Sequence, residues 1–124
     1  MAPKPNTILV IDDDADTRDA LRELFELHGY KVHCAENGLA ALDKIQRWRV
    51  PPALIVVDLF MPVMDGRTFL RKVREDHSTK DVPIIFITGD PLAQASGADV
   101  TLIKPLKPQI LLSTVRRFVK PAGQ

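Results

Sequence analysis

Short apolar runs alternate with amphipathic segments along this chain, the pattern of a βα protein built around a parallel sheet. Three of the five runs are continuously apolar, as expected for strands that helices cover on both faces. The expected strands are Thr7–Ile11, Lys31–Ala35, Leu54–Val57, Pro83–Ile87 and Val100–Ile103. Because Lys31–Ala35 is the more polar run, we expect it at an edge of the sheet.

Four other segments carry apolar residues at helical spacing. They predict helices at Ala15–His28, Gly38–Arg47, Gly66–Glu75 and Lys107–Val119. In the first of these, the residues expected on the apolar face are Ala20, Leu21, Leu24 and Leu27. Gly29 is well suited to end that helix, because glycine readily adopts the left-handed conformation of a helix C-terminus.

The connection between the fourth and fifth expected strands is short. Gly89–Asp99 has 11 residues and includes Pro91 and Gly97. Since a complete crossover between parallel strands needs at least about 10–12 residues, only one or two helical turns fit there. We therefore expect a shortened or irregular fourth helix.

The composition is that of a single soluble globular domain of 124 residues. We expect the domain at 7–119, with short tails at 1–6 and 120–124. A net charge of +1 gives no general attraction to nucleic acid or to a membrane surface. One cysteine, Cys34, excludes an intrachain disulfide, and no segment has the length and apolarity of a membrane span. These features favour a cytoplasmic protein.

Polar side chains gather where the expected strands end. Asp12–Asp14 follow the first strand, Asp58 ends the third, Thr88 the fourth and Lys104 the fifth. Ligands of open parallel sheets bind outside the carboxyl ends of the strands, so these groups are expected to converge at one rim.

Such a group of residues suits phosphoryl chemistry. Clustered carboxylates repel one another unless a cation neutralises them, and an all-oxygen acidic site suits Mg²⁺. An aspartate such as Asp58 can also act as a nucleophile and form an aspartyl phosphate. The added charge would then be met by Mg²⁺, by the ammonium of Lys104 and by the hydroxyl of Thr88.

Plainer interpretations exist for the same acids. Asp12–Asp14 could cap the first helix, although capping needs one residue rather than three. Asp12, Asp14 and Asp16 also resemble the start of a calcium-binding EF-hand loop. Against that interpretation, Thr17 stands where the loop needs glycine, and a strand rather than a helix precedes the run.

The motifs together resemble the receiver domains of response regulators. The resemblance rests on Ile8–Asp14 with Arg18, on Asp58-Leu-Phe-Met-Pro-Val-Met-Asp-Gly66, on Thr88, and on Gly97–Asp99 leading to Lys104-Pro105. It extends from about residue 7 to residue 119. It implies a doubly wound α/β fold of the flavodoxin-like type, with five parallel strands in the order 2-1-3-4-5.

The resemblance also implies roles for single residues. Asp58 matches the phosphoacceptor, and Thr88 and Lys104 match the hydroxyl and the ammonium that meet the phosphoryl group. Mg²⁺ would be bound by Asp13, Asp58 and the backbone carbonyl of Phe60, with Asp12 acting through water. Lys104-Pro105 matches a cis peptide bond of the family.

Two departures from the family pattern concern the output side. Thr101 stands where the family usually has an aromatic switch residue, and the crossover Gly89–Asp99 is about half a dozen residues shorter than usual. The face around the fourth helix and fifth strand, a common dimer and partner surface in the family, must therefore be altered. The resemblance also implies that Phe60 and Asp90 occupy positions that, in the family, tune the rate at which the phosphoryl group is hydrolysed.

These observations favour a stand-alone two-component response regulator, not an enzyme with an external substrate. It would take its phosphoryl group from a sensor histidine kinase or a histidine phosphotransfer protein and signal to a further protein, with a homodimer left open. A phosphohydrolase with an aspartate nucleophile is the alternative, although Phe60 stands where such enzymes have a second acid. A receiver-like interaction module that needs no phosphorylation is a third hypothesis.

Overall fold

The computed structural model describes residues 5–93 and 97–123. Five parallel strands form one sheet in the order β2-β1-β3-β4-β5. The strands are β1 (Thr7–Ile11), β2 (Lys31–Ala35), β3 (Leu54–Asp58), β4 (Ile84–Thr88) and β5 (Val100–Ile103). The helices are α1 (Ala15–Leu27), α2 (Gly38–Arg47), α3 (Gly66–Glu75) and α4 (Pro108–Phe118). The predicted fold class and strand order are confirmed.

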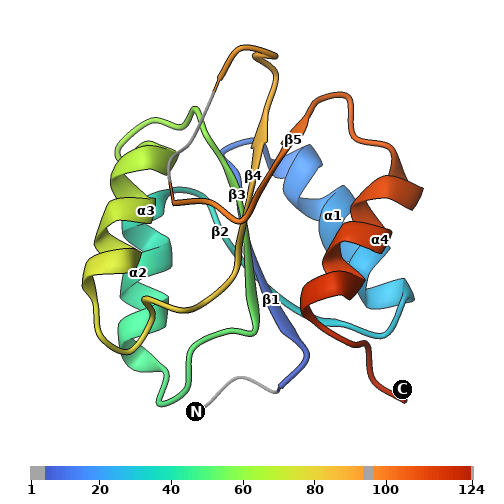
Figure 1. The fold of residues 1–124 in the computed structure, drawn as a ribbon, viewed down its shortest axis with the longest axis horizontal. Helices are drawn as coiled ribbons and strands as arrows, with labels where there is room; N and C mark the ends of the chain where they lie inside the picture. The colour runs from blue at the N-terminus through green and yellow to red at the C-terminus, as the bar shows by residue number, and fades with distance from the viewer. Residues whose placement is uncertain (1–4, 94–96, 124) are drawn as a thin grey trace.

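Two layers of helices enclose the sheet. Figure 1 views the sheet edge-on, with α2 and α3 against one face and α1 and α4 against the other. One apolar cluster lies between the sheet and the helices α1 and α4, and a second lies between the sheet and the helices α2 and α3. The strands β1, β3 and β4 are buried along their whole length, which explains their continuous apolar sequences. Of the described helices, not one is long and apolar enough to pass through a bilayer.

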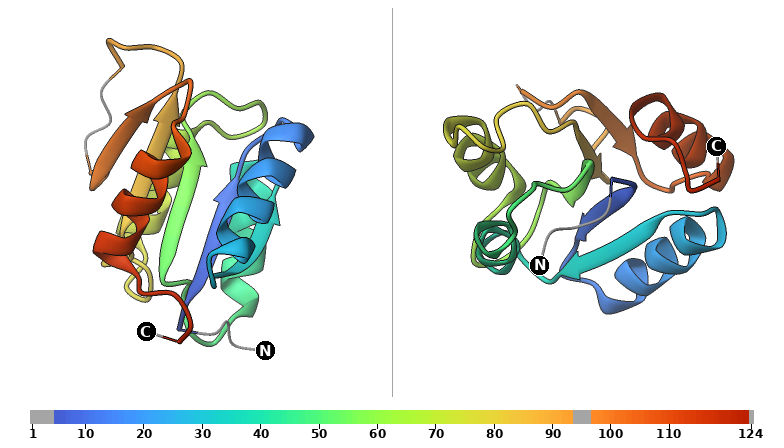
Figure 2. Two further views of the ribbon diagram at one scale, coloured as in Figure 1. Left: turned by 90° about the vertical axis from the view of Figure 1, so that its right-hand side faces the viewer. Right: turned by 90° about the horizontal axis from the view of Figure 1, so that it is seen from below.

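All five strands run in the same direction, so their carboxyl ends meet at one rim (Figures 1 and 2). The more polar strand β2 lies at a sheet edge, as predicted. Five of the nine predicted elements have the observed bounds, and α1, β3, β4 and α4 differ by one residue at one or both ends. The strand β4 begins at Ile84 rather than Pro83, and α4 spans Pro108–Phe118 rather than Lys107–Val119.

The prediction for the apolar face of α1 was partly wrong. Leu21 is buried, but its main companion in the core is Phe25, four residues later, and Leu27 is 78% exposed. Positions 21 and 25 lie one turn apart, directly over the sheet. Leu24 is partly buried and packs against the core, as predicted, whereas Ala20 is exposed; both line a groove between α1 and α4.

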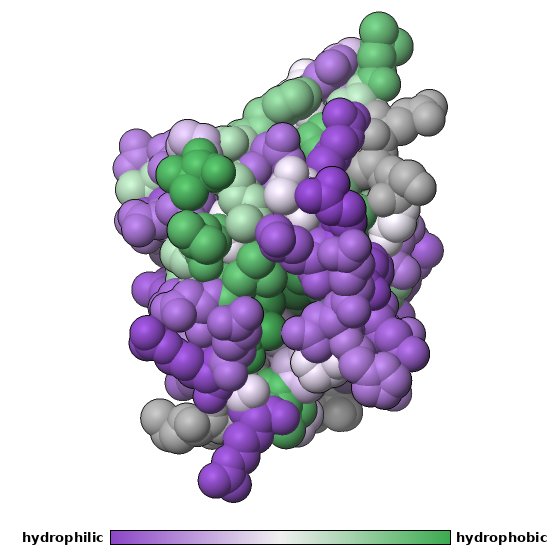
Figure 3. Space-filling view, turned by 90° about the vertical axis from the view of Figure 1, so that its left-hand side faces the viewer, coloured by the Kyte–Doolittle hydropathy of each residue, from purple (hydrophilic) through white to green (hydrophobic). Residues whose placement is uncertain are grey.

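The outer face of α2 and α3 is mostly polar. Figure 3 shows this face, with apolar surface gathered in a hollow between two polar flanks. Leu39 and Leu42 of α2 and Met64, just before α3, line the groove between the two helices. The sulfur of Met64 lies 3.1 Å from where a Cβ on Gly38 would be, so the start of α2 packs closely against this loop.

The crossover from β4 to β5 contains no helix in its described parts, residues 89–93 and 97–99. The predicted shortening is therefore observed there, while any turn at residues 94–96 lies outside the described residues. Gly97 has φ of +95°, and a Cβ on it would lie 3.2 Å from Leu70 of α3. The helix numbered α4 is consequently the one that follows β5.

One arginine holds this short crossover in place. The guanidinium of Arg74, near the end of α3, donates hydrogen bonds to the carbonyl oxygens of Gly97, Lys80 and Val82. It also pairs with the carboxylate of Asp99 at 3.1 Å. The same Asp99 oxygen accepts from the backbone N–H of Ile84, 2.8 Å away. Arg74 thus joins α3, the start of β4 and the start of β5.

Replacing Arg74 with methionine should lower the free energy of unfolding by about 1–2 kcal/mol, because three backbone carbonyls and a carboxylate lose a charged donor near the surface. Urea unfolding monitored by circular dichroism measures this change. Arg71→Met, on the exposed side of the same helix, is the matched control and should change stability by less than about 0.5 kcal/mol. Equal effects of the two substitutions would contradict the bridging role.

Candidate functional site

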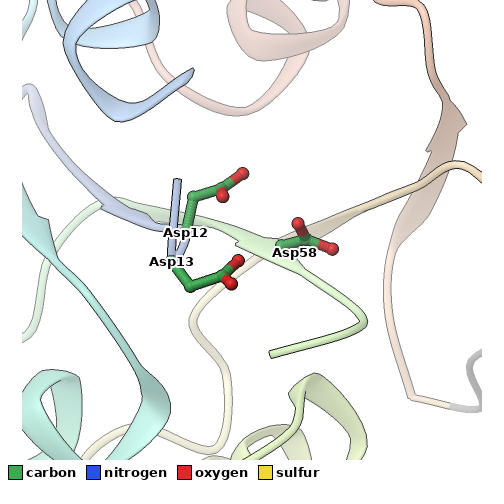
Figure 4. A group of neighbouring side chains, drawn as sticks. All are labelled: Asp12, Asp13 and Asp58. Atoms are coloured by element: carbon green, nitrogen blue, oxygen red, sulfur yellow. The ribbon is translucent and has the colours of Figure 1, made fainter. Parts of the chain in front are cut away.

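Three carboxylates meet at the rim formed by the strand carboxyl ends. Asp12 and Asp13 directly follow β1, and Asp58 is the last residue of the neighbouring strand β3. Each offers an oxygen, and these oxygens all lie within 4.8 Å of one another. Asp12 and Asp58 are buried, whereas Asp13 is exposed. Figure 4 shows the three side chains directed into the same space above the sheet. The sequence argument for convergence is thus confirmed for these acids.

The turn that carries Asp12 is fixed by the backbone and by an arginine. One carboxylate oxygen of Asp12 accepts from the N–H of Asp14 at 2.9 Å. The guanidinium of Arg18 donates to the carbonyl oxygen of Asp12 at 2.7 Å. The sequence indicated no role for Arg18 beyond its place in the motif. Its position one turn into α1, six residues after Asp12, is what allows it to reach back.

The helix-capping interpretation holds for Asp14 alone. Asp14 is the N-cap of α1, and its carboxylate accepts from the N–H of Asp16 and the hydroxyl of Thr17. These hydrogen bonds, that of Thr17 first, lower the pKa of Asp14 below its usual value. Because this carboxylate is occupied by capping, Asp12 and Asp13 remain for the rim. The calcium-loop interpretation, which groups Asp12, Asp14 and Asp16, is wrong. The acids that lie together are Asp12, Asp13 and Asp58.

The loop after Asp58 is folded tightly against the strand end. The N–H of Phe60 donates to one carboxylate oxygen of Asp58 at 3.0 Å. The N–H of Gly66 donates to the carbonyl of Leu59, and a Cβ on Gly66 would lie only 2.7 Å from the carbonyl oxygen of Asp58. Asp65 caps α3, and its carboxylate accepts from the N–H of Thr68. Gly66 was predicted only as the start of α3; its close approach to Asp58 depends on a tertiary contact.

Lys104 reaches the cluster from the end of β5. Its ammonium lies 3.1 Å from one carboxylate oxygen of Asp58 and 3.8 Å from one of Asp12. The second distance is an ion pair but is too long for a hydrogen bond. The peptide bond Lys104-Pro105 is cis, as the family resemblance implied.

Thr88, the last residue of β4, lies next to these groups but makes a different contact. It is fully buried, and its hydroxyl accepts from the N–H of Asp90 at 3.1 Å. The carbonyl of Thr88 accepts from the N–H of Lys104 at 2.7 Å. The structure therefore places Thr88 at the rim, linked through the backbone to Lys104, with its hydroxyl turned to its own loop.

The electrostatics of the cluster favour a cation. Burial, followed by the charges of Asp58 and Asp13, raises the pKa of Asp12 above its usual value. Burial by itself lowers the pKa of Lys104, but the hydrogen bond and charge of Asp58 raise it overall. One buried oxygen of Asp12 has no hydrogen-bond partner among the described residues. A bound cation with its water shell would satisfy that oxygen, and an all-carboxylate donor set fits Mg²⁺.

Val63, on the loop between Asp58 and α3, is conformationally strained. It has φ of +68°, a region that β-branched residues rarely adopt, and it is exposed. The N–H of Met64 donates to the carbonyl of Pro62 across this residue. The loop geometry thus comes from its neighbours rather than from the preference of Val63.

Val63→Gly should raise the free energy of unfolding by about 1 kcal/mol. The strain released, about 1–3 kcal/mol, exceeds the entropy lost by introducing glycine, about 0.5–1 kcal/mol. Chemical unfolding measures the gain. Val50→Gly is the control, because Val50 is also exposed and lies in a loop without a positive φ. That variant should be destabilised, and a stabilised Val50→Gly would argue against local strain at Val63.

A groove of about 540 Å³ opens beside Lys104, between α1 and the start of α4. Its walls are mainly apolar and include Leu21, Leu24, Leu106 and Leu111. Asp16 and Thr17 of the first turn of α1 also line it. The acidic cluster is therefore bordered by a hollow wide enough for side chains of another protein.

Comparison with known proteins agrees with this geometry. A family model described as the response regulator receiver domain matches residues 8–116. Response regulator Rre1 of Synechocystis is 34% identical over 123 residues, which cover 94% of this chain and 52% of that protein. The chain thus spans about half the length of the curated relatives it matches.

Solved structures give the same result. The chemotaxis response regulator CheY4 of Vibrio cholerae is 31% identical, with a TM-score of 0.84, covering 94% of this chain and 100% of that one. The receiver domain of the sensor histidine kinase PA1611 from Pseudomonas aeruginosa is 26% identical, with a TM-score of 0.84, covering 93% and 98%. That structure holds a magnesium ion in its active-site cleft.

Proposed function

Because this chain belongs to the response regulator receiver family, we propose that Asp58 accepts a phosphoryl group from a phosphohistidine of a kinase or phosphotransfer protein. The observation that carries the proposal is the buried carboxylate of Asp58, held 3.1 Å from Lys104 and grouped with Asp12 and Asp13. Members of this family are phosphoacceptor regulators rather than enzymes with external substrates, and we propose the same for this chain.

In the proposed transfer, a carboxylate oxygen of Asp58 attacks phosphorus. The bond from phosphorus to the donor imidazole breaks, and its electron pair stays on the imidazole nitrogen. Lys104, already paired with Asp58, compensates the charge that gathers on the phosphoryl oxygens. The N–H of Phe60, 3.0 Å from the carboxylate, keeps Asp58 in one orientation.

The proposed metal site consists of Asp13, Asp58 and the carbonyl of Phe60, with Asp12 acting through water. When bound there, Mg²⁺ would supply positive charge against the acidic cluster and the phosphoryl oxygens. Support comes from the three carboxylates within 4.8 Å of one another and from the buried oxygen of Asp12 that accepts no hydrogen bond from the described residues.

The phosphorylated state would be transmitted through Thr88 and Lys104. Thr88 would exchange its hydrogen bond with Asp90 for one donated to the phosphoryl group, moving the loop that follows β4. The N–H of Lys104 is bonded to the carbonyl of Thr88, so the end of β5 would move with it. Because Thr101 lacks an aromatic ring, a readout by ring rotation at that position is excluded.

The groove between α1 and α4 supports the proposed protein donor. It borders Lys104 and is mainly apolar, so a partner that packs there would have its phosphohistidine near Asp58. The donor would then be oriented by the same contact that removes water from the site.

Incubation with Mg²⁺ and acetyl phosphate, followed by intact-mass measurement, tests the proposal. We expect one phosphoryl adduct, absent in Asp58→Asn and in excess chelator. Asp65→Asn is the matched control, because Asp65 lies in the same loop but caps α3; its adduct should persist. An adduct that survives in Asp58→Asn would contradict the assignment. Turnover of small phosphate esters that requires Asp58 would instead favour the phosphohydrolase hypothesis.

A further inference from the structure

Hydrogen bonds fix Asp12 on every side except the one that faces the cluster. Its N–H donates to the carbonyl of Ala35, at the end of β2, at 3.2 Å. Its carbonyl oxygen accepts from the guanidinium of Arg18 at 2.7 Å, and one carboxylate oxygen accepts from the N–H of Asp14 at 2.9 Å. The other carboxylate oxygen lies 3.8 Å from the ammonium of Lys104 and accepts no hydrogen bond from the described residues. The fixed atoms therefore direct this oxygen to the rim.

Arg18 closes a ring of hydrogen bonds between the end of β1 and the first turn of α1. The N–H of Arg18 donates to the carbonyl of Asp14, the N-cap of α1, at 3.0 Å. Asp14 in turn donates to the carboxylate of Asp12, and the half-buried side chain of Arg18 returns to the carbonyl of Asp12. Without the guanidinium the ring is open on one side, and the turn that carries the acids is free to rotate.

The contact with Arg18 bears on Asp13 as well as on Asp12. The carbonyl of Asp12 and the N–H of Asp13 belong to one rigid peptide plane. A hydrogen bond that fixes the direction of this carbonyl therefore also fixes the direction in which the side chain of Asp13 leaves the backbone. Figure 4 shows the carboxylates of both acids directed into the space beside Asp58. One arginine thus orients two neighbouring acids of the cluster.

We propose that Arg18 is a positioning residue of the metal site. Through the carbonyl of Asp12 it holds Asp12 and Asp13 in the orientation that binds a divalent cation, without touching the cation itself. Loss of a residue that supports metal ligands typically weakens metal binding about ten- to hundredfold. This inference rests on the proposed function, which supplies the Mg²⁺ whose binding is concerned.

The charge of Arg18 acts in the opposite direction from its hydrogen bond. A guanidinium beside the cluster repels a second cation, so loss of the charge alone would tighten Mg²⁺ binding. Loss of the hydrogen bond would weaken it. The exposed Arg22, one turn later in α1, carries the same charge near the same place. Burial raises the pKa of Cys34 on β2, and Arg22 and Arg18 both lie close enough to oppose that rise. Arg22 is therefore the matched control.

Isothermal titration of the metal-free, unphosphorylated chain with Mg²⁺ tests the proposal. Arg18→Gln is neutral and too short to place a donor at the same point, and it should raise the Mg²⁺ dissociation constant about tenfold or more. Arg18→Lys keeps the charge but lacks the planar guanidinium, so its dissociation constant should lie between those of the wild type and Arg18→Gln. Arg22→Gln should bind Mg²⁺ at least as tightly as the wild type.

The proposal is overturned if Arg18→Gln binds Mg²⁺ as tightly as the wild type or more tightly, because the arginine would then act only through its charge. If Arg18→Gln does not fold by circular dichroism, Arg18→Lys decides, and an unchanged dissociation constant overturns the proposal.

Measurement of the phosphoryl adduct separates this inference from the proposed function. A wild type that forms the adduct, together with unaltered Mg²⁺ binding in Arg18→Gln, would disprove the role of Arg18 alone. A wild type that binds Mg²⁺ but forms no adduct on Asp58 would disprove the proposed function alone. A wild type that binds no Mg²⁺ would overturn both.

Discussion

Gly66→Ala should lower the free energy of unfolding by about 2–3 kcal/mol and reduce formation of the phosphoryl adduct. A Cβ at this position would lie 2.7 Å from the carbonyl oxygen of Asp58 and 2.9 Å from the Cα of Leu59. Both neighbours are backbone atoms, so neither can rotate away as the end of a side chain could. Either α3 or the end of β3 must shift, and the carboxylate of Asp58 would move with the strand.

The control for this substitution lies at the same rim. Gly89 directly follows Thr88, and a Cβ there would have no heavy atom of residues 5–93 or 97–123 within 4 Å. Gly89→Ala should therefore leave stability nearly unchanged. Urea unfolding gives the two free energies, and intact mass after acetyl phosphate gives the adducts. If Gly66→Ala is as stable as Gly89→Ala, the close approach of α3 to Asp58 is not what requires glycine.

Asp12→Asn should strongly reduce the stabilisation of the fold by Mg²⁺. A ligand present at 100 times its dissociation constant stabilises a folded protein by about 2.7 kcal/mol, and the wild type should gain that amount. The variant removes one of three clustered negative charges and should gain far less. Thermal or urea unfolding with and without Mg²⁺ measures the difference. Asp19→Asn, an exposed acid on α1, is the control and should keep the full gain.

Without Mg²⁺ the same variant should be more stable than the wild type. The pKa of Asp12 is raised in the folded state by burial and by neighbouring negative charge. A raised carboxyl pKa means that this group binds its proton more tightly in the folded state, so the contribution of Asp12 to stability falls as pH rises above about 3.8 and levels off beyond the folded pKa. The amide in Asp12→Asn cannot ionise, so the variant should lack this loss. The free energy of unfolding of both proteins is measured against pH with chelator present. If the wild type becomes more stable than Asp12→Asn as pH rises, the proposed destabilisation by the Asp12 charge is contradicted.

The stability difference connects the site to the proposed signal. A cluster that is destabilising alone becomes stabilising when a cation and a phosphoryl group balance its charges. Lys104 contacts both Asp58 and Asp12 and is bonded through its backbone to Thr88. A change of charge at Asp58 would therefore reach the ends of β4 and β5 through atoms already in contact.

The sequence by itself determined the order of elements and the place where the candidate site residues meet. Continuous apolar runs mark strands buried on both faces, and each run ends at a polar residue. Since all strands are parallel, their carboxyl ends must meet at one rim, which brings Asp12, Asp13, Asp58 and Lys104 together. The polarity of β2 predicted its position at an edge of the sheet. The 11 residues of Gly89–Asp99 predicted that the crossover between β4 and β5 has no room for a full helix.

Only the tertiary structure decided which atoms of these residues meet. Helical spacing could not decide which of two apolar stripes of α1 faces the sheet: the stripe of Leu21 and Phe25, which is buried, or the stripe of Leu24 and Leu27, which ends in an exposed residue. The hydrogen bonds of Arg18 and Arg74 to backbone carbonyls depend on where distant segments pack. The close approach of Gly66 to the carbonyl oxygen of Asp58 and the partial exposure of β5 also depend on how distant segments pack. Local patterns specify periodicity and polarity, whereas such contacts join residues whose relative positions are fixed only when the sheet and helices have packed.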